Sequence, residues 1–212
     1  MLVRDGAHGL EVFMIRRSLR LVFAGGAHVF PGGAVDDADR EMAGDASLAF
    51  KVAAVRECFE EAGFLLAVDV AGDVVRLDDP TTADRFSAYR WAIAGGDTSL
   101  AAVCASEGLR PDVDRMHYVS RWITPEGAPR RFDTRFFVCI APDRQTPLHD
   151  ATETIAHEWV RPVDMLERHA NRDVDLMLPT ERSLQWLGER TSAADVLAAA
   201  AVSPPRGQYQ RG

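Results

Sequence analysis

The chain has 212 residues, of which 47% are hydrophobic and 26% are charged. These values are ordinary for a globular protein, and the length suits one domain with a sizeable core. The formal net charge of −8 argues against non-specific binding of nucleic acid or of anionic membranes, because both require a basic surface. A local basic pocket for a phosphorylated small molecule is still compatible with this charge.

The N-terminus lacks the pattern of a signal peptide, and no run of 18 apolar residues predicts a transmembrane helix. The three cysteines, Cys58, Cys104 and Cys139, have no metal-binding spacing, and each lies in an apolar run. We therefore expect three buried, reduced thiols in a cytoplasmic protein that has no membrane partner.

The N-terminal region predicts a hairpin followed by a glycine turn. Residues 1–17 hold two strand-like runs around a glycine-bearing connection, as in a β-hairpin. A basic cluster over residues 16–20 is either a solvated loop or a grip for an anion. The turn is Pro-Gly-Gly at residues 31–33, and the preceding His28 is more typical of a structural histidine than of a catalytic one.

A long helix follows this turn. Asp45 or Ser47 can cap a helix over residues 48–62, and Gly63 suits its C-terminal end. The apolar positions of this segment favour packing against a sheet. Residues 64–68 then predict a strand.

The second half of the chain alternates between helices and strands. Residues 79–116 predict two helices that form an insertion. Strands are predicted over residues 117–123, 131–140 and 157–160, and the second of these is rich in β-forming residues. Helices, the last of them rich in alanine, fill most of the remaining chain before a tail over residues 203–212.

Three glutamates lie within about one turn of the long helix. Residues three and four apart share a helix face, so Glu57 lies beside both Glu60 and Glu61. Such crowding of like charge is tolerated on a solvated surface, or where a cation offsets the repulsion. Hard divalent cations such as Mg²⁺ prefer oxygen ligands and are often held by carboxylates together with substrate phosphate.

The residues around these glutamates distinguish the two interpretations. Residues 56–64 (RECFEEAGF), with Gly33 upstream, resemble the Nudix hydrolase signature G-x5-E-x7-R-E-U-x-E-E-x-G-U, in which U is a bulky apolar residue. Counting from Gly33, the next signature glutamate falls on Asp39, a shorter carboxylate. Between Asp39 and Arg56 there are 16 residues where the common pattern has 7, which indicates an insertion around residues 41–48.

Several stretches outside this box are similar to the coenzyme A diphosphatase branch of the family, and in particular to Nudix 19-type enzymes and their bacterial relatives. These stretches are the Phe-Pro-Gly-Gly start of the lengthened box, residues 122–126 (WITPE), residues 131–137 (RFDTRFF) and Glu158-Trp159. An upstream motif of the branch contains Arg-Ser and a later arginine. Arg17-Ser18 matches the first part, whereas Arg20 lies two positions before the place of the later arginine.

The resemblance implies the Nudix fold, an α/β fold in which a mixed β-sheet is sandwiched between helices (α/β/α). It implies a single domain over residues 1–202 with the helical insertion at 79–116, followed by a flexible tail over 203–212. The resemblance also implies hydrolysis of a diphosphate linkage in a small-molecule nucleoside diphosphate derivative. The cofactor would be Mg²⁺ or Mn²⁺, bound by Glu57, Glu60 and Glu61 and by the backbone carbonyl of Gly32.

Further roles follow from the same resemblance. Glu57 is the first choice for the general base, and Arg56 is expected to orient the acidic cluster. A further metal-binding carboxylate from a later loop is expected, with Glu153 as the first candidate and Glu158 as the second.

A coenzyme A or acyl-coenzyme A substrate would give 3′,5′-ADP and a 4′-phosphopantetheine, acylated or not. Its 3′-phosphate needs a cationic partner, for which the candidates are Arg17, Arg20, Arg131 and Arg135. Arginine is suited to bidentate binding of phosphate. Gly33 is also expected to contact the substrate.

Two alternative functions remain open on the sequence. One is a Nudix pyrophosphatase for another nucleoside diphosphate derivative, such as NADH, ADP-ribose or a nucleotide sugar. The other is a Nudix-fold ligand-binding module without turnover, which loss of the box carboxylates would favour, yet all of them are present. No nucleic-acid partner is expected. The apolar helix over residues 196–202 suits either a homodimer interface or packing on its own domain.

Overall fold

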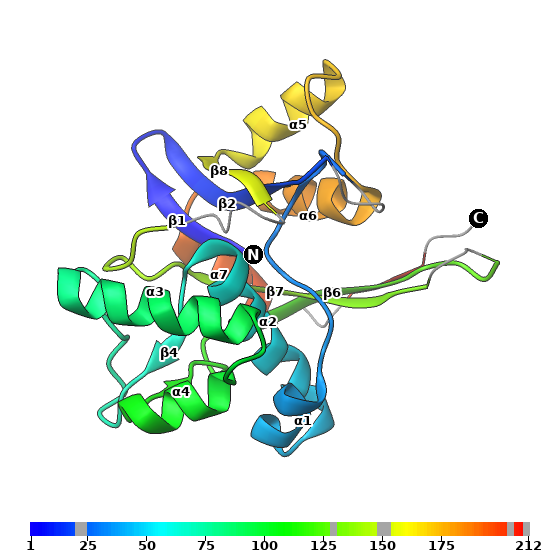
Figure 1. Ribbon diagram of the computed structural model, residues 1–212. Coiled ribbons are helices and arrows are strands. Elements are labelled where there is room, and N and C mark those ends of the chain that lie inside the picture. Colours follow the sequence, from blue (N-terminus) through cyan, green and yellow to red (C-terminus); the bar gives the residue numbers. More distant parts are fainter. Residues whose placement is uncertain (20–24, 128–130, 148–153, 203–205, 210–212) are drawn as a thin grey trace. The chain divides into compact units, whose positions relative to one another are not determined.

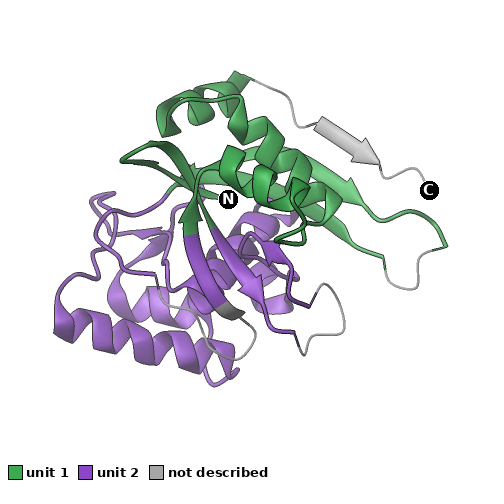
Figure 2. Ribbon diagram, turned by 90° about the horizontal axis from the view of Figure 1, so that it is seen from above, with its two compact units in different colours: residues 1–13, 115–140, 159–212 green, residues 14–114, 141–158 purple. Residues whose placement is uncertain are grey.

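The computed structural model describes residues 1–19, 25–127, 131–147, 154–202 and 206–209 (Figure 1). The chain divides into two units, which Figure 2 shows in green and purple. Unit 1 comprises residues 1–13, 115–140 and 159–212, and unit 2 comprises residues 14–114 and 141–158. Strands β2 (Gly9–Arg17) and β8 (Thr154–Val160) pair with each other, and each belongs partly to one unit and partly to the other.

The strands of unit 1 are ordered β2-β1-β7-β6-β9. Their bounds are Leu2–Gly6 for β1, His117–Ile123 for β6, Asp133–Ile140 for β7 and Arg206–Tyr209 for β9. The predicted hairpin is confirmed, since β1 and β2 are antiparallel with Val3 opposite Val12. β7 is parallel to β1 and antiparallel to β6, and the register of β6 shifts between Tyr118 and Ser120. Strand β9 is parallel to β6 and lies in the segment predicted as a tail.

The helices of unit 1 follow one another along the chain as α5 (Pro162–Ala170), α6 (Leu178–Gly188) and α7 (Ala193–Val202). Both α5 and α6 have a proline in the first turn, where the missing N–H removes no hydrogen bond of the helix. The start of α7 is held by β1, because the backbone N–H of Ala193 donates to the Asp5 carboxylate at 2.7 Å. Met165, Leu184 and Leu187 are fully buried.

Unit 2 contains the long predicted helix and the two predicted inserted helices. The bounds of its elements are His28–Val29 for β3, Asp37–Ala43 for α1, Ala46–Ala62 for α2, Ala67–Val68 for β4, Pro80–Ala94 for α3, Leu100–Glu107 for α4 and Arg110–Pro111 for β5. β3 pairs with the end of β2, and β4 pairs with β5. The caps of α3 and α4 are Asp79 and Ser99, whose side chains accept hydrogen bonds from the first turn.

The strand prediction over residues 64–68 is wrong for most of its length, because only Ala67–Val68 forms a strand. The backbone of Leu65 is instead bonded to the buried amide of Gln145, at 2.8 Å from its N–H and 3.0 Å to its carbonyl. A second bond from this amide reaches the carbonyl of Val75 at 2.9 Å. The Gln145 side chain, which is distant in sequence, therefore makes the backbone hydrogen bonds that a neighbouring strand would otherwise make. The periodicity of the sequence does not indicate such a partner.

The architecture is mixed α/β, as the sequence predicts. The three cysteines are buried and free, which confirms the expected thiols. Within the described ranges, no helix combines the length and the apolar composition needed to cross a membrane.

Candidate active site

The candidate site of unit 2 is built on the C-terminal half of α2. The Asp45 side chain accepts from the first turn, and Gly63 ends the helix in the left-handed conformation at φ 76°. One face of α2 is apolar and buried, including Val55, Cys58 and Phe59. Helical periodicity places the signature's arginine and first two glutamates on other faces, where they are half-buried.

Arg56 is the centre of a carboxylate network. Its guanidinium lies 3.0 Å from Asp39, 3.4 Å from Asp36, 3.1 Å from Glu57 and 3.2 Å from Glu60. It also donates to the backbone carbonyl of Ala34 at 2.8 Å, downstream of the glycine turn. Its role as the organiser of the acidic cluster, which the resemblance implies, fits these contacts. When all four carboxylates are ionised, these five side chains carry three more negative than positive charges.

The electrostatics of the network disfavour full ionisation. Burial raises the pKa of Glu57 from 4.5 to about 7, and Glu60 adds to the rise while Arg56 opposes it. Burial is also the main cause that raises the pKa of Glu60. Burial by itself would lower the pKa of Arg56, but the hydrogen bonds with Asp39 and the charges of the carboxylates outweigh it, so this pKa is raised. The cluster therefore has a surplus of negative charge that a further cation would relieve.

The glycine turn approaches α2 closely. The N–H of Gly32 donates to Glu61 Oε2 at 2.8 Å, which ties the third glutamate to the turn. A Cβ atom on Gly33 would lie 2.3 Å from Glu57 Oε1, so only glycine leaves this carboxylate in place. Glu61 is buried, at 6% exposure, whereas Glu57 and Glu60 are half-buried. The turn and the helix thus bring Gly32 to Glu61 and Gly33 to Glu57.

Helix α1 brings in two aspartates, of which the signature identified one. Asp36 caps α1 by accepting from the N–H of Asp39 at 2.7 Å, and Asp39 accepts from the N–H of Asp36 at 3.0 Å. Asp39 is 2% exposed and is held by Arg56 through both oxygens. The sequence reasoning missed Asp36 and the helix itself. Carboxylates at positions 36 and 39 ahead of Gly44 were the available signal, as in a capping box.

Arg90 is a further residue that the sequence reasoning missed. It lies on α3, is 2% exposed and donates from Nε to the backbone carbonyl of Glu60 at 2.8 Å. This carbonyl belongs to the last turn of α2, where four carbonyls have no partner within the helix. One of the predicted inserted helices therefore anchors the turn that carries Glu60.

His28 and Glu158 form a pair in the same unit. His28 is 7% exposed, and its Nε2 lies 3.3 Å from Glu158 Oε1. Glu158 was the second candidate for a later carboxylate of the site, and this contact links it to the strand that leads into the glycine turn. The first candidate, Glu153, lies outside the described residues, as does Arg20.

The remaining arginine candidates have separate positions. Arg17 is half-buried at the end of β2 in unit 2. Arg131 and Arg135 belong to unit 1, where Arg131 is exposed and donates to the carbonyl of Thr124 at 3.2 Å. Arg135, on β7, lies opposite Arg121 of β6. Their proposed contacts with a phosphate stay predictions.

The residues of the cluster fit a divalent metal in chemistry, because hard cations take carboxylate oxygens and the cluster carries surplus negative charge. Within the part of the chain that the structure describes, no set of three carboxylate, imidazole or thiol groups lies close enough together to hold an ion. The reason is visible in the contacts: Arg56 draws Glu57 and Glu60 toward itself, and Glu61 bonds with the turn. Metal binding would require these side chains to turn from Arg56 and Gly32.

Comparison with known proteins supports the same reading of the signature. Residues 40–185 match the family model described as the NUDT19 Nudix domain. The chain is 26% identical to the human acyl-coenzyme A diphosphatase NUDT19 over 90% of the chain and 64% of that protein. It is 27% identical to the Gallus gallus protein of the same name over 80% of the chain and 58% of that protein. It therefore spans about 58 to 64% of the length of these curated relatives.

A solved structure matches nearly the whole chain. The crystal structure of a NUDIX hydrolase from Alicyclobacillus acidocaldarius superposes with a TM-score of 0.84, at 31% identity, over 96% of this chain and 95% of that one. At this identity and coverage the likeness extends beyond the general fold. Together with the family model, it establishes that this chain belongs to the Nudix hydrolase family, within the group of NUDT19-type Nudix domains.

Proposed function

We propose that the chain is a metal-dependent hydrolase that cleaves the diphosphate of coenzyme A or of acyl-coenzyme A. The products are 3′,5′-ADP and 4′-phosphopantetheine, acylated or not. The observation that carries the proposal is the surplus of negative charge around Arg56, which is chemistry suited to a metal–diphosphate complex. The choice of coenzyme A rests on the curated relatives, whose names give acyl-coenzyme A as their substrate.

The glutamates and the turn have distinct roles in this proposal. Glu57, Glu60 and Glu61 would hold Mg²⁺ or Mn²⁺ together with the Gly32 carbonyl. The bound metal supplies neutralisation of the diphosphate charge and a lowered pKa for water. Water adds to one phosphorus, the P–O bond of the anhydride breaks, and the other phosphate leaves.

The proton of that water needs an acceptor. Glu57 is the first choice for this base, and in the metal-free cluster burial raises the pKa of its carboxyl. Arg56 is a positioning residue that keeps Glu57 and Glu60 beside each other before a metal binds, through its 3.1 Å and 3.2 Å contacts. The phosphate on the ribose is proposed to meet arginines from the set of Arg17, Arg20, Arg131 and Arg135.

A substrate panel tests the proposal. The protein is incubated with Mg²⁺ or Mn²⁺ and with coenzyme A, an acyl-coenzyme A, NADH, ADP-ribose and a nucleotide sugar, and products are separated by chromatography. We expect 3′,5′-ADP from coenzyme A or its ester. If coenzyme A and its ester stay intact while another diphosphate is cleaved, the coenzyme A assignment is wrong and the broader pyrophosphatase alternative takes its place. If every diphosphate stays intact, the ligand-binding alternative is favoured.

The metal-site assignment has a test of its own. Replacement of Glu60→Gln together with Glu61→Gln should abolish turnover, since the two carboxylates that would bind the metal become neutral amides. A matched control is Glu107→Gln on α4, whose carboxylate bonds Arg85 and Tyr89 rather than the cluster. The control should retain turnover. Full activity in the double variant, with Mn²⁺ affinity unchanged in calorimetry, would show that the metal lies elsewhere.

A further inference from the structure

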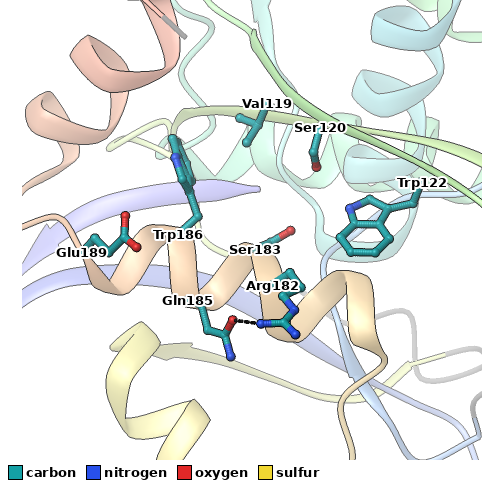
Figure 3. Close-up of a pocket in the computed structure, with 8 residues that line it drawn as sticks. All are labelled: Val119, Ser120, Trp122, Arg182, Ser183, Gln185, Trp186 and Glu189. Atoms are coloured by element: carbon teal, nitrogen blue, oxygen red, sulfur yellow. Dashed lines mark hydrogen bonds between the residues drawn. The ribbon is translucent and has the colours of Figure 1, made fainter. Parts of the chain in front are cut away.

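A pocket lies within unit 1, between strand β6 and helix α6 (Figure 3). Its volume is about 150 Å³, similar to that of an engineered cavity that binds benzene. Its lining includes two tryptophans, Trp122 from β6 and Trp186 from α6, which Figure 3 shows at opposite ends. None of the carboxylates on α2 contributes to it. The pocket is therefore large enough for a single ring system, and its two indoles can pack against such a ring.

The periodicities of the two elements produce this lining. Ser120 and Trp122 are two residues apart on β6, so they share a face of the strand. Ser183 and Trp186 are three apart on α6, so they share a face of the helix. All four side chains belong to residues that are at most 8% exposed. The pocket is thus a built feature of the packing of unit 1.

Trp122 brings an unused donor into this pocket. The residue is 7% exposed, and its indole Nε1 is buried without an acceptor among the described residues. In Figure 3 the nitrogen-bearing edge of the indole faces Ser120 and Ser183, toward the interior of the lining. A buried N–H is almost always paired in a folded protein. A ligand atom that accepts a hydrogen bond would pair it.

The other polar groups of the pocket leave both donors and acceptors for a ligand. Arg182 gives one N–H to Gln185 Oε1 at 2.8 Å, and a guanidinium has five such donors. The amide of Gln185 is used at both ends, because its nitrogen donates to Glu181 at 2.9 Å. The Ser183 hydroxyl donates to the carbonyl of Pro179 at 2.8 Å. Trp122 and Arg182 therefore offer donors to acceptors on a ligand, whereas the Ser183 oxygen and the Glu189 carboxylate can accept from N–H groups of the same ligand.

We propose that this pocket binds a planar heterocyclic ring that carries hydrogen-bond acceptors, with a purine base as the class that fits. Ring nitrogens of a purine accept from Trp122 Nε1 and from Arg182, and its faces pack against indole. The inference goes beyond the proposed function, because it involves neither the carboxylates of α2 nor turnover.

The test uses adenosine as the probe, because adenosine has no phosphate and needs no metal. Protein labelled with ¹⁵N at the tryptophan indoles is titrated in EDTA, and the signals of Trp91, Trp122, Trp159 and Trp186 are followed by NMR. The Trp122 indole signal should move on saturation, and the Trp91 signal should not. Indole, which is planar but lacks a ring acceptor, should bind at least tenfold more weakly. A Trp122 signal that does not move, or equal binding of indole, would overturn the proposal.

Two variants separate the hydrogen bond from the packing. Trp122→Phe keeps an aromatic ring but removes Nε1, and it should weaken adenosine binding about tenfold, as expected for one lost hydrogen bond. Arg182→Met keeps the stem of an exposed side chain, so it tests the pocket even if Trp122→Phe impairs folding, and it should bind several-fold more weakly. Trp91→Phe, on α3 outside the pocket, is the control and should bind normally. Normal binding by both pocket variants would refute the assignment.

The outcome is independent of the proposed function. Adenosine binding that persists in the Glu60→Gln, Glu61→Gln double variant would support the pocket without any turnover. An active diphosphatase that binds no adenosine in EDTA would overturn the pocket proposal alone.

Discussion

The substitution Gly33→Ala isolates the contact between the glycine turn and the general-base candidate. The Cβ that it adds would lie 2.3 Å from Glu57 Oε1 and 2.5 Å from its carboxyl carbon, whereas ordinary contact begins near 3.4 Å. The carboxylate must therefore move by about 1 Å. Gly33 does not need the left-handed backbone conformation, so alanine adds no backbone strain there.

The expected loss of activity is large, whereas the expected loss of stability is small. A misplacement of about 1 Å in a catalytic geometry costs on the order of 100-fold in rate. The displaced atoms are the end of a flexible side chain, and Gly→Ala reduces the entropy of the unfolded chain, so the melting temperature should stay the same or rise. Gly188→Ala on α6 is the control, since its added Cβ meets Val163 at an ordinary 3.4 Å.

A double-mutant cycle with Glu57→Gln shows whether the loss acts through Glu57. The assay is kcat/KM for the diphosphate that is cleaved fastest, with Mg²⁺, alongside thermal melting of each variant. In the Glu57→Gln background, Gly33→Ala should cost little more, because the two residues act as a unit. Activity of Gly33→Ala within threefold of the wild type would refute the reasoning. An equal, roughly 100-fold loss in both backgrounds would refute the coupling.

Three further predictions concern stability. In the metal-free protein, the raised pKa of Glu57 stabilises the fold fully below pH 4.5, and this stabilisation of roughly 3 kcal/mol is lost as the pH rises through about 7. Urea melts at a series of pH values should show this fall in the free energy of unfolding, and a flat profile contradicts it. Gln145→Leu leaves the buried Leu65 backbone unpaired and should cost about 2–4 kcal/mol in the same melts, so a loss below 1 kcal/mol refutes its role. Asp133→Asn breaks an exposed pair with Arg121 and should cost under about 1 kcal/mol, and a larger loss contradicts this.

The local structure around the signature was predictable, because its determinants are close in sequence. The cap at Asp45, the apolar face and the end at Gly63 specify α2, whose observed start at Ala46 lies within two residues of the predicted one. The spacing of Glu57, Glu60 and Glu61 then follows from helical geometry. The hairpin at the N-terminus and the strands β6 and β7 were predictable for the same reason.

The misses arise where a partner distant in sequence decides the local structure. Leu65 lies in an apolar run that is typical of a strand, yet the amide of Gln145, 80 residues later, bonds its backbone. Helix α1 overlaps the predicted insertion at 41–48 only at its C-terminal end and was not predicted, and its cap Asp36 joins the Arg56 network only because the chain folds back. Arg90 likewise reaches Glu60 across 30 residues.

The sequence by itself determined the family signature, the helix that carries it and the identity of the glutamates, since these depend on residue types at short, regular spacings. Only the tertiary structure decided which groups surround those glutamates and how these neighbours shift their pKa values. It showed that a single guanidinium faces four carboxylates, that Glu61 is bonded to the N–H of Gly32 and that burial raises the pKa of Glu57 to about 7. The physical reason is that burial and Coulomb interactions depend on distances through space, which spacing along the chain does not specify.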